Sequence, residues 1–174
     1  MLLPSRRPQP KIPIPEPDTD PQLPRPRLAL LGSGNMYMHV GDLRRAEVDL
    51  SAALEINAER PEIWNDRAAC RSRAGRHDDA LVDTEGALRL RPDFAPALSN
   101  RGNAYRALNQ SSAAKAAYNA ALLLDPLDAR TWNNRGALQE ESGNLVAAEL
   151  DIRHALTPRP PSRHEGDQMI GGLG

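Results

Sequence analysis

The apolar and small residues of this chain recur at steps of three and four, the spacing that predicts amphipathic helices. Between residues 95 and 128, Leu98, Gly102 and Tyr105 mark one helix and Ala114 marks a second. Helices of about twelve residues are only marginally stable alone. We therefore expect each pair of helices to form a hairpin that buries its apolar faces by stacking on neighbouring hairpins.

This pattern returns every 34 residues and divides the chain into four hairpins, 27–60, 61–94, 95–128 and 129–160. Two positions hold alanine in every copy: Ala46, Ala80, Ala114 and Ala148 at one, and Ala53, Ala87, Ala121 and Ala155 at the other. We expect alanine there because two helices approach too closely for a larger side chain. The turn inside each hairpin falls on a residue that tolerates a left-handed backbone, namely Gly41, Gly75, Asn109 or Gly143.

Further positions of the repeat carry a family signature. In the third hairpin they are Leu98, Arg101, Gly102, Tyr105, Ala114, Tyr118 and Pro126, and in the fourth Trp132, Arg135, Gly136, Gln139, Ala148 and Ile152. This order of residues resembles the tetratricopeptide repeat, although arginine takes the usual leucine position and Gln139 the usual tyrosine position. The resemblance implies an all-α fold, a right-handed superhelical solenoid of four helix-turn-helix hairpins, whose first helices line a concave groove.

The two ends of the chain differ from the repeats. Residues 1–26 contain nine prolines, which predicts a disordered, extended leader. Arg7, Pro10 and Pro13 have the spacing of a ligand for small adaptor domains, but a plain flexible leader is the favoured interpretation. Residues 161–174 are glycine-rich and predict a flexible tail.

The end of the last hairpin lacks the polar capping helix that usually closes a solenoid. Without it, apolar residues of the last helix would face water, among them Val146, Leu150 and Ile152. They could be covered by a second copy of the chain, or the helix could fray at its end. We favour fraying, and keep a weak homo-oligomer as the alternative.

Composition excludes several classes of function. The formal net charge of the 174 residues is −1, which argues against a nucleic-acid binder or a binder of anionic membranes. Cys70 is the only cysteine, so no disulfide forms within the chain and no paired-cysteine metal site exists. No apolar stretch is long enough to insert into a membrane, and the first residues lack the apolar core of a secretory signal, so we expect neither. We expect a cytoplasmic protein without a cofactor or metal.

Charged residues also recur one repeat apart. Arg67, Arg101 and Arg135 share a position on the first helices, which usually faces the seam of a hairpin. Asp49, Asp83 and Asp151 share one on the second helices, with Ala117 interrupting the set. We predict ion pairs between the two sets, because a guanidinium in a partly dry seam needs a carboxylate. The pairs could form within a hairpin or between consecutive hairpins.

The concave groove is the predicted binding site. Its face should carry the second, fifth, sixth, ninth, twelfth and thirteenth residue of each hairpin, and this face is rich in asparagine. An asparagine carries both a donor and an acceptor, so it can hold an extended peptide backbone. The predicted groove residues are Asn65, Asn100, Asn103, Arg106, Arg130, Asn133 and Asn134. The alternative is that these side chains are merely solvated or hydrogen-bonded locally.

We therefore expect a non-enzymatic adaptor that binds a protein or an extended peptide. The carboxylate clamp by which similar repeats bind acidic chaperone tails is matched only in part: Asn100 fits and Arg130 can replace a lysine, but Asn65, Ala69 and Asn134 do not fit. The alternative role is structural self-association through the last hairpin.

The sequence gives little indication that the protein is an enzyme. The four histidines lie far apart in repeat phase, and no nucleophile, base and acid fall together. The segment Gly32-Ser33-Gly34 imitates a phosphate-binding loop, but Tyr37 stands where the third glycine is needed. Gly34 is expected to lie where the second helix crosses the first, and Cys70 to pack in the core.

Overall fold

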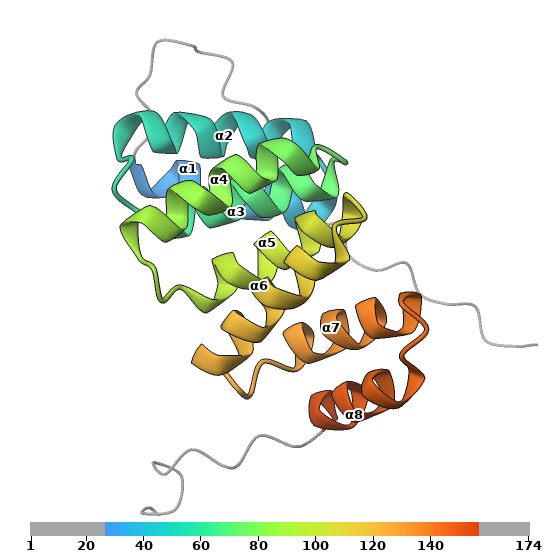
Figure 1. Cartoon of the computed structure of the whole chain (residues 1–174). Coiled ribbons are helices and arrows are strands. Elements are labelled where there is room, and N and C mark those ends of the chain that lie inside the picture. The colour runs from blue at the N-terminus through green and yellow to red at the C-terminus, as the bar shows by residue number, and fades with distance from the viewer. Residues whose placement is uncertain (1–26, 157–174) are drawn as a thin grey trace, which may run out of the picture.

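The computed structural model describes residues 27–156, with side chains from residue 32 onward. This part of the chain folds into eight helices and no strand (Figure 1). Their bounds are α1 Arg27–Val40, α2 Leu43–Ile56, α3 Pro61–Arg73, α4 His77–Leu90, α5 Ala95–Ala107, α6 Ser111–Leu124, α7 Ala129–Glu141 and α8 Leu145–Ala155. The predicted all-α fold of stacked hairpins is confirmed. The predicted leader and tail lie outside the described residues.

The helices follow the 34-residue period of the sequence. First helices begin at residues 27, 61, 95 and 129, and second helices at 43, 77, 111 and 145. Inside each hairpin one residue has a positive φ: 85° at Gly41, 79° at Gly75, 59° at Asn109 and 76° at Gly143. The prediction of a left-handed turn residue is therefore confirmed in all four hairpins, including the one where asparagine replaces glycine.

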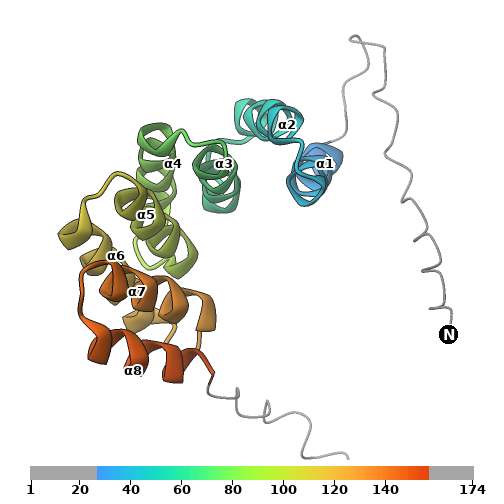
Figure 2. The same cartoon turned by 90° about the vertical axis from the view of Figure 1, so that its right-hand side faces the viewer.

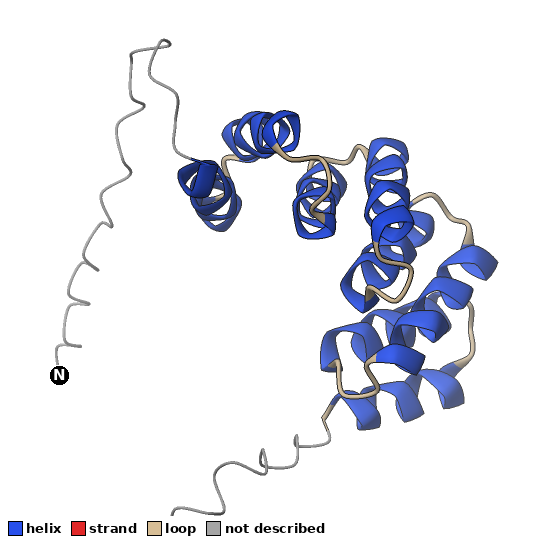
Figure 3. Ribbon diagram, turned by 90° about the vertical axis from the view of Figure 1, so that its left-hand side faces the viewer, coloured by secondary structure: helices blue, strands red, loops and turns tan. Residues whose placement is uncertain are grey.

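The hairpins form a curved stack with the first helices on its inner side. Figures 2 and 3 show the helices arranged in an arc. Neighbouring first helices touch one another along the arc, whereas within the described residues no second helix touches another second helix. Elements on the inner side of a curve lie closer together than those on its outer side. The first helices α1, α3, α5 and α7 therefore line the concave face.

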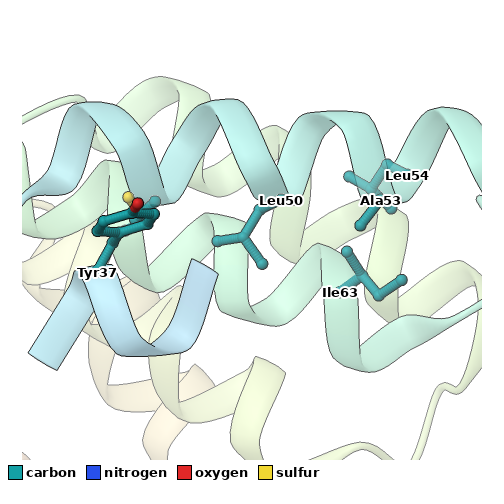
Figure 4. Close-up of a cluster of buried hydrophobic side chains, with 7 residues drawn as sticks. Tyr37, Leu50, Ala53, Leu54 and Ile63 are labelled. Atoms are coloured by element: carbon teal, nitrogen blue, oxygen red, sulfur yellow. The ribbon is translucent and has the colours of Figure 1, made fainter. Parts of the chain in front are cut away.

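Small residues allow the two helices of each hairpin to pack closely. A Cβ atom on Gly102 would lie 2.5 Å from the ring of Tyr118, which is fully buried. A Cβ atom on Gly34 would lie 2.9 Å from the Leu50 side chain, as expected for the place where α2 crosses α1. At the first hairpin, Leu50 joins Tyr37 and Ile63 in a cluster formed by α1, α2 and α3 (Figure 4).

The predicted arginine–aspartate pairs form within hairpins. Arg67 contacts Asp83 at 2.7 and 3.0 Å, and Arg135 contacts Asp151 at 2.6 and 2.8 Å. In both pairs the residues are 16 positions apart, which decides between the two registers left open by the sequence. The third guanidinium nitrogen of each arginine donates to the second helix of the preceding hairpin, at Ser51 and Asn119 respectively. Each arginine thus also joins successive hairpins.

The first and third hairpins show what happens when one partner of the pair is replaced. In the first hairpin Ser33 stands at the arginine position, and its hydroxyl donates to Asp49 at 2.5 Å. In the third hairpin Ala117 stands at the aspartate position, and Nε of Arg101 is buried without a hydrogen-bond partner. The pairing prediction is therefore wrong for Arg101, because the residue that would accept its hydrogen bond is missing.

The far end of the stack exposes apolar side chains that are buried in earlier hairpins. Ile152 is 43% exposed, whereas Tyr118 at the same position one repeat earlier is 0% exposed. Leu156 is 76% exposed, and Leu122 one repeat earlier only 6%. Val146 and Leu150 differ from these two residues, because their repeat positions are exposed in the earlier hairpins too. The prediction that they belong to the uncovered stacking face is therefore wrong for Val146 and Leu150, which lie on the outer surface.

Candidate functional site

A polar hollow of about 480 Å³ opens between α5 and α7 on the concave side. Its lining includes three of the predicted groove residues, brought together from two hairpins: Asn103, Arg106 and Asn134. The remaining lining residues are Ala107, Asn109 and Glu141. The hollow thus presents amide donors and acceptors beside one ion pair, which suits hydrogen bonding to a peptide backbone.

Two contacts fix the side chains of this hollow. Arg106 binds Glu141 across the two helices, with Nε 3.1 Å from both carboxylate oxygens and Nη2 3.0 Å from one of them. The Tyr118 hydroxyl donates to Oδ1 of Asn103 at 2.8 Å, and burial raises the pKa of Tyr118 to about 12. Tyr118 therefore stays protonated at neutral pH and orients Asn103, whose amide N–H groups point away from this bond.

A second polar cluster lies on α1, α3 and α5. Asn100 donates from Nδ2 to Oδ1 of Asn65 at 2.9 Å, so these two predicted groove residues are also in contact. Beside them, burial raises the pKa of Asp66 above its ordinary value, while hydrogen bonds from Asn35 and Asn65 act in the opposite direction. The charge of Glu62 raises the pKa of Asp66 further.

Contacts between successive first helices share one register. Asn65 and Asn100, Arg106 and Glu141 are each 35 residues apart, one more than the repeat. Arg73 and Met38 have the same separation, with Nη1 of the arginine donating to the methionine carbonyl at 2.8 Å. Because the register recurs at three junctions, the concave face has a regular one-residue offset from hairpin to hairpin.

The structure does not bring together all seven predicted groove residues. Asn65 and Asn100 form one group, and Asn103, Arg106 and Asn134 another. Arg130 and Asn133 are exposed on α7 and do not line the hollow.

Asn35 and Asp66 belong to the second polar cluster but are not among the groove residues predicted from the sequence. Their repeat positions, the ninth and the sixth, lie on the same predicted face as the asparagines. These repeat positions could have identified both residues as groove residues from the sequence alone.

The described residues contain no cluster of three or more histidine, cysteine, aspartate or glutamate side chains arranged to hold a metal ion. Cys70 is buried in the first core cluster, and burial raises the pKa of its thiol. Its Sγ lies 3.3 Å from the carbonyl oxygen of Leu43, to which the thiol donates. Cys70 is therefore a packed core residue, as the sequence predicted. Among the helices described, none combines the length and apolar character needed to cross a bilayer.

Comparison with protein families gives a match over residues 99–163, to a model described as tetratricopeptide repeat. The chain is a tetratricopeptide repeat protein. The Hsp70-Hsp90 organizing protein of Triticum aestivum is 32% identical over 93 residues, which are 53% of this chain and 16% of the relative. Protein O-mannosyl-transferase TMTC1 of Mus musculus is 30% identical over 128 residues, which are 71% of this chain and 14% of the relative. The chain thus spans about a sixth of the first relative's length and a seventh of the second's.

A solved tetratricopeptide repeat domain has the same arrangement of hairpins. The first such domain of Spaghetti (RPAP3), solved bound to the HSP90 peptide SRMEEVD, superimposes with a TM-score of 0.64 at 25% identity. The match covers 67% of this chain and 95% of that domain.

Proposed function

We propose that this tetratricopeptide repeat protein is a non-enzymatic interaction module that binds an extended peptide of a partner protein in its concave groove. The observation that carries the proposal is the asparagine-rich inner face, where Asn103 and Asn134 from two hairpins line one polar hollow. The peptide-bound RPAP3 domain, which has the same fold, supports it. The mouse relative is named as a transferase, but this chain corresponds to only 14% of its length.

Asparagine suits this role because a peptide backbone offers N–H and C=O groups alternately along its length. Asn103 uses its oxygen to accept from Tyr118, so its amide N–H groups remain to donate to a peptide carbonyl. Asn134 on the opposite wall can both donate and accept. The proposed groove residues remain Asn65, Asn100, Asn103, Arg106, Arg130, Asn133 and Asn134, and a cytoplasmic location is proposed with them.

An acidic chaperone tail is the less favoured ligand, although the wheat relative is an Hsp70-Hsp90 organizing protein and the RPAP3 domain was solved bound to an HSP90 peptide. Arg106 is the basic residue of the hollow, and Glu141 already neutralises it. An acidic peptide would have to displace Glu141, which would then lie unpaired beside the peptide carboxylate. The repulsion between the Glu141 carboxylate and the peptide carboxylate would oppose binding.

A peptide library displayed on phage tests the proposal with the full chain as bait. Binding of the most enriched peptide is then measured for the wild type and for the double variant Asn100→Ala, Asn134→Ala. We expect at least about tenfold weaker binding, because each lost amide leaves a backbone group of the peptide unpaired. Lys115→Ala, an exposed change on α6, is the matched control and should bind as the wild type. Failure to enrich any peptide would contradict groove binding.

Self-association through the last hairpin is the second candidate function, and the exposure of Ile152 and Leu156 favours it. These two side chains occupy positions that the next hairpin covers elsewhere in the stack. Light scattering of the full chain over a range of concentrations tests the idea. A mass that stays that of one chain at every concentration would exclude it.

A further inference from the structure

Asn109 departs from the pattern of the hairpin turns. The other three hairpins have glycine at this position, with φ of 85° at Gly41, 79° at Gly75 and 76° at Gly143, whereas φ of Asn109 is 59°. A left-handed backbone favours glycine, so asparagine is the less stable choice for the turn itself. Asn109 also lines the polar hollow between α5 and α7. The hairpin without a turn glycine is therefore the one whose turn residue borders the hollow.

The hollow offers hydrogen-bonding groups that the protein itself leaves unused. Within the described residues, the side-chain amides of Asn109 and Asn134 make no hydrogen bond. Asn103 accepts from the Tyr118 hydroxyl at 2.8 Å, which leaves its NH2 group to donate. Three amides from α5, the following turn and α7 thus line one space, with a donor at Asn103 and both donors and acceptors at the other two.

The charges that line the hollow cancel each other. Its two charged residues are Arg106 and Glu141, which form an ion pair at 3.0 to 3.1 Å. A cationic ligand group would compete with Arg106 for the Glu141 carboxylate, and an anionic group would compete with Glu141 for Arg106. An apolar group would remove water from the three amides without replacing its hydrogen bonds, which is unfavourable. The hollow therefore suits a neutral polar group.

We propose that the hollow is a subsite for a carboxamide side chain, a glutamine or an asparagine, of the peptide held in the groove. The proposal rests on the proposed function and adds the chemistry of one ligand position to it. The carboxamide oxygen accepts from the NH2 group of Asn103, and the carboxamide NH2 donates to the amide oxygens of Asn109 and Asn134. A hydroxyl side chain has a single donor, so it satisfies fewer of these groups. Asn109 is then a specificity-determining residue of the groove.

Peptides selected from a phage library by the full-length chain test the subsite. The wild type should enrich peptides with glutamine or asparagine at one fixed position, and Asn109→Gly should reduce that enrichment. For the strongest wild-type peptide, Asn109→Gly should weaken binding about tenfold, because the carboxamide loses one of its acceptors in a partly dry place. Glycine is the residue of the other three turns, so the unfolding temperature of this variant should equal or exceed that of the wild type.

Gln110→Ala is the matched control. It removes an exposed carboxamide next to Asn109 in sequence that lies outside the hollow and makes no capping hydrogen bond. This variant should bind each selected peptide as the wild type does.

Changing the peptide completes a double-mutant cycle. Its glutamine or asparagine is replaced by the matching acid, glutamate or aspartate, or by an apolar residue of similar shape, methionine or leucine. Each replacement should weaken binding to the wild type about tenfold, and should weaken binding to Asn109→Gly less, because the two changes remove the same hydrogen bond.

Several results would overturn the subsite while leaving groove binding intact. They are selected peptides without a fixed carboxamide position, or equal binding of the parent peptide by the wild type and Asn109→Gly. Earlier thermal unfolding of Asn109→Gly would show that asparagine serves the turn, and would likewise overturn the role given to Asn109. Enrichment of no peptide at all would instead contradict the proposed function.

Discussion

Arg67 on α3 holds both carboxylate oxygens of Asp83 on α4, at 3.0 and 2.7 Å. Asp83 is fully buried, and Nη1 of Arg71 makes a further ion pair with it at 2.9 Å. Arg71 also binds Glu47 of the preceding hairpin, whose pKa is lowered mainly by its hydrogen bond from Arg76. Asp83 therefore joins the two helices of its hairpin, and its two arginine partners connect that hairpin to the preceding one.

Replacing Asp83 by alanine should lower the free energy of unfolding by about 3 kcal/mol, because two partly buried guanidinium groups lose their partner. Urea unfolding followed by circular dichroism measures the change. Asp78→Ala on the same helix is the control, and its effect should stay below about 1 kcal/mol since Asp78 is exposed. Equal stability of Asp83→Ala and the wild type would show that the pair contributes nothing.

Supplying the missing carboxylate of the third hairpin should have the opposite effect. Ala117→Asp places an acceptor where the pattern of the second and fourth hairpins requires one, next to the unpartnered Nε of Arg101. We expect a gain of about 1 kcal/mol in unfolding free energy. Ala117→Leu, which adds similar bulk without charge, should lose stability by overpacking. If both variants lose stability equally, the site has no room for the pair.

Asp66 should make folding stability fall as pH rises. Its pKa is raised in the folded protein, so above the ordinary value of about 4 the folded state binds more protons than the unfolded state. The stabilising contribution is complete below that value and is lost as pH passes through the raised pKa. The unfolding free energy of Asp66→Asn minus that of the wild type should therefore increase from pH 4 to pH 7. A difference that stays constant over this range would contradict the raised pKa of Asp66.

Leucines one repeat apart should differ sharply in their contribution to stability. Leu122→Ala should cost about 3 kcal/mol, because the side chain is buried between hairpins. Leu156→Ala, the same change at the same repeat position, should cost less than about 0.5 kcal/mol, since this leucine is largely exposed. Chemical unfolding of dilute samples measures both. A large loss with Leu156→Ala would mean that another surface covers it.

The sequence predicted the helices and the turns because they depend on local chemistry that repeats. Small residues such as Gly34 occur where helices cross, and Asn109 takes the left-handed turn position, so a 34-residue period was enough to place both. The period also predicted that Arg67 and Arg135 would meet aspartates. It could not select the register, because pairing within a hairpin or with its neighbour depends on how two helices cross in space.

The candidate site was predicted as a face and not as a set of contacts. Repeat position shows which residues line the groove, but it does not show that Asn65 meets Asn100 or that Arg106 meets Glu141. Those contacts join residues 35 positions apart and depend on the rotation between successive hairpins. The pKa of Asp66 is raised mainly by burial, which a sequence pattern does not report.

The contacts between first helices, without matching contacts between second helices, have a mechanical consequence. Each second helix packs against the first helix that follows it, but no second helix of the described residues packs against another, so successive hairpins diverge on the outer side of the arc. A small rotation at each junction adds up along the stack, while the packing inside every hairpin stays intact. A ligand that contacts α3, α5 and α7 together would therefore change the curvature of the whole stack while the packing inside each hairpin stays the same.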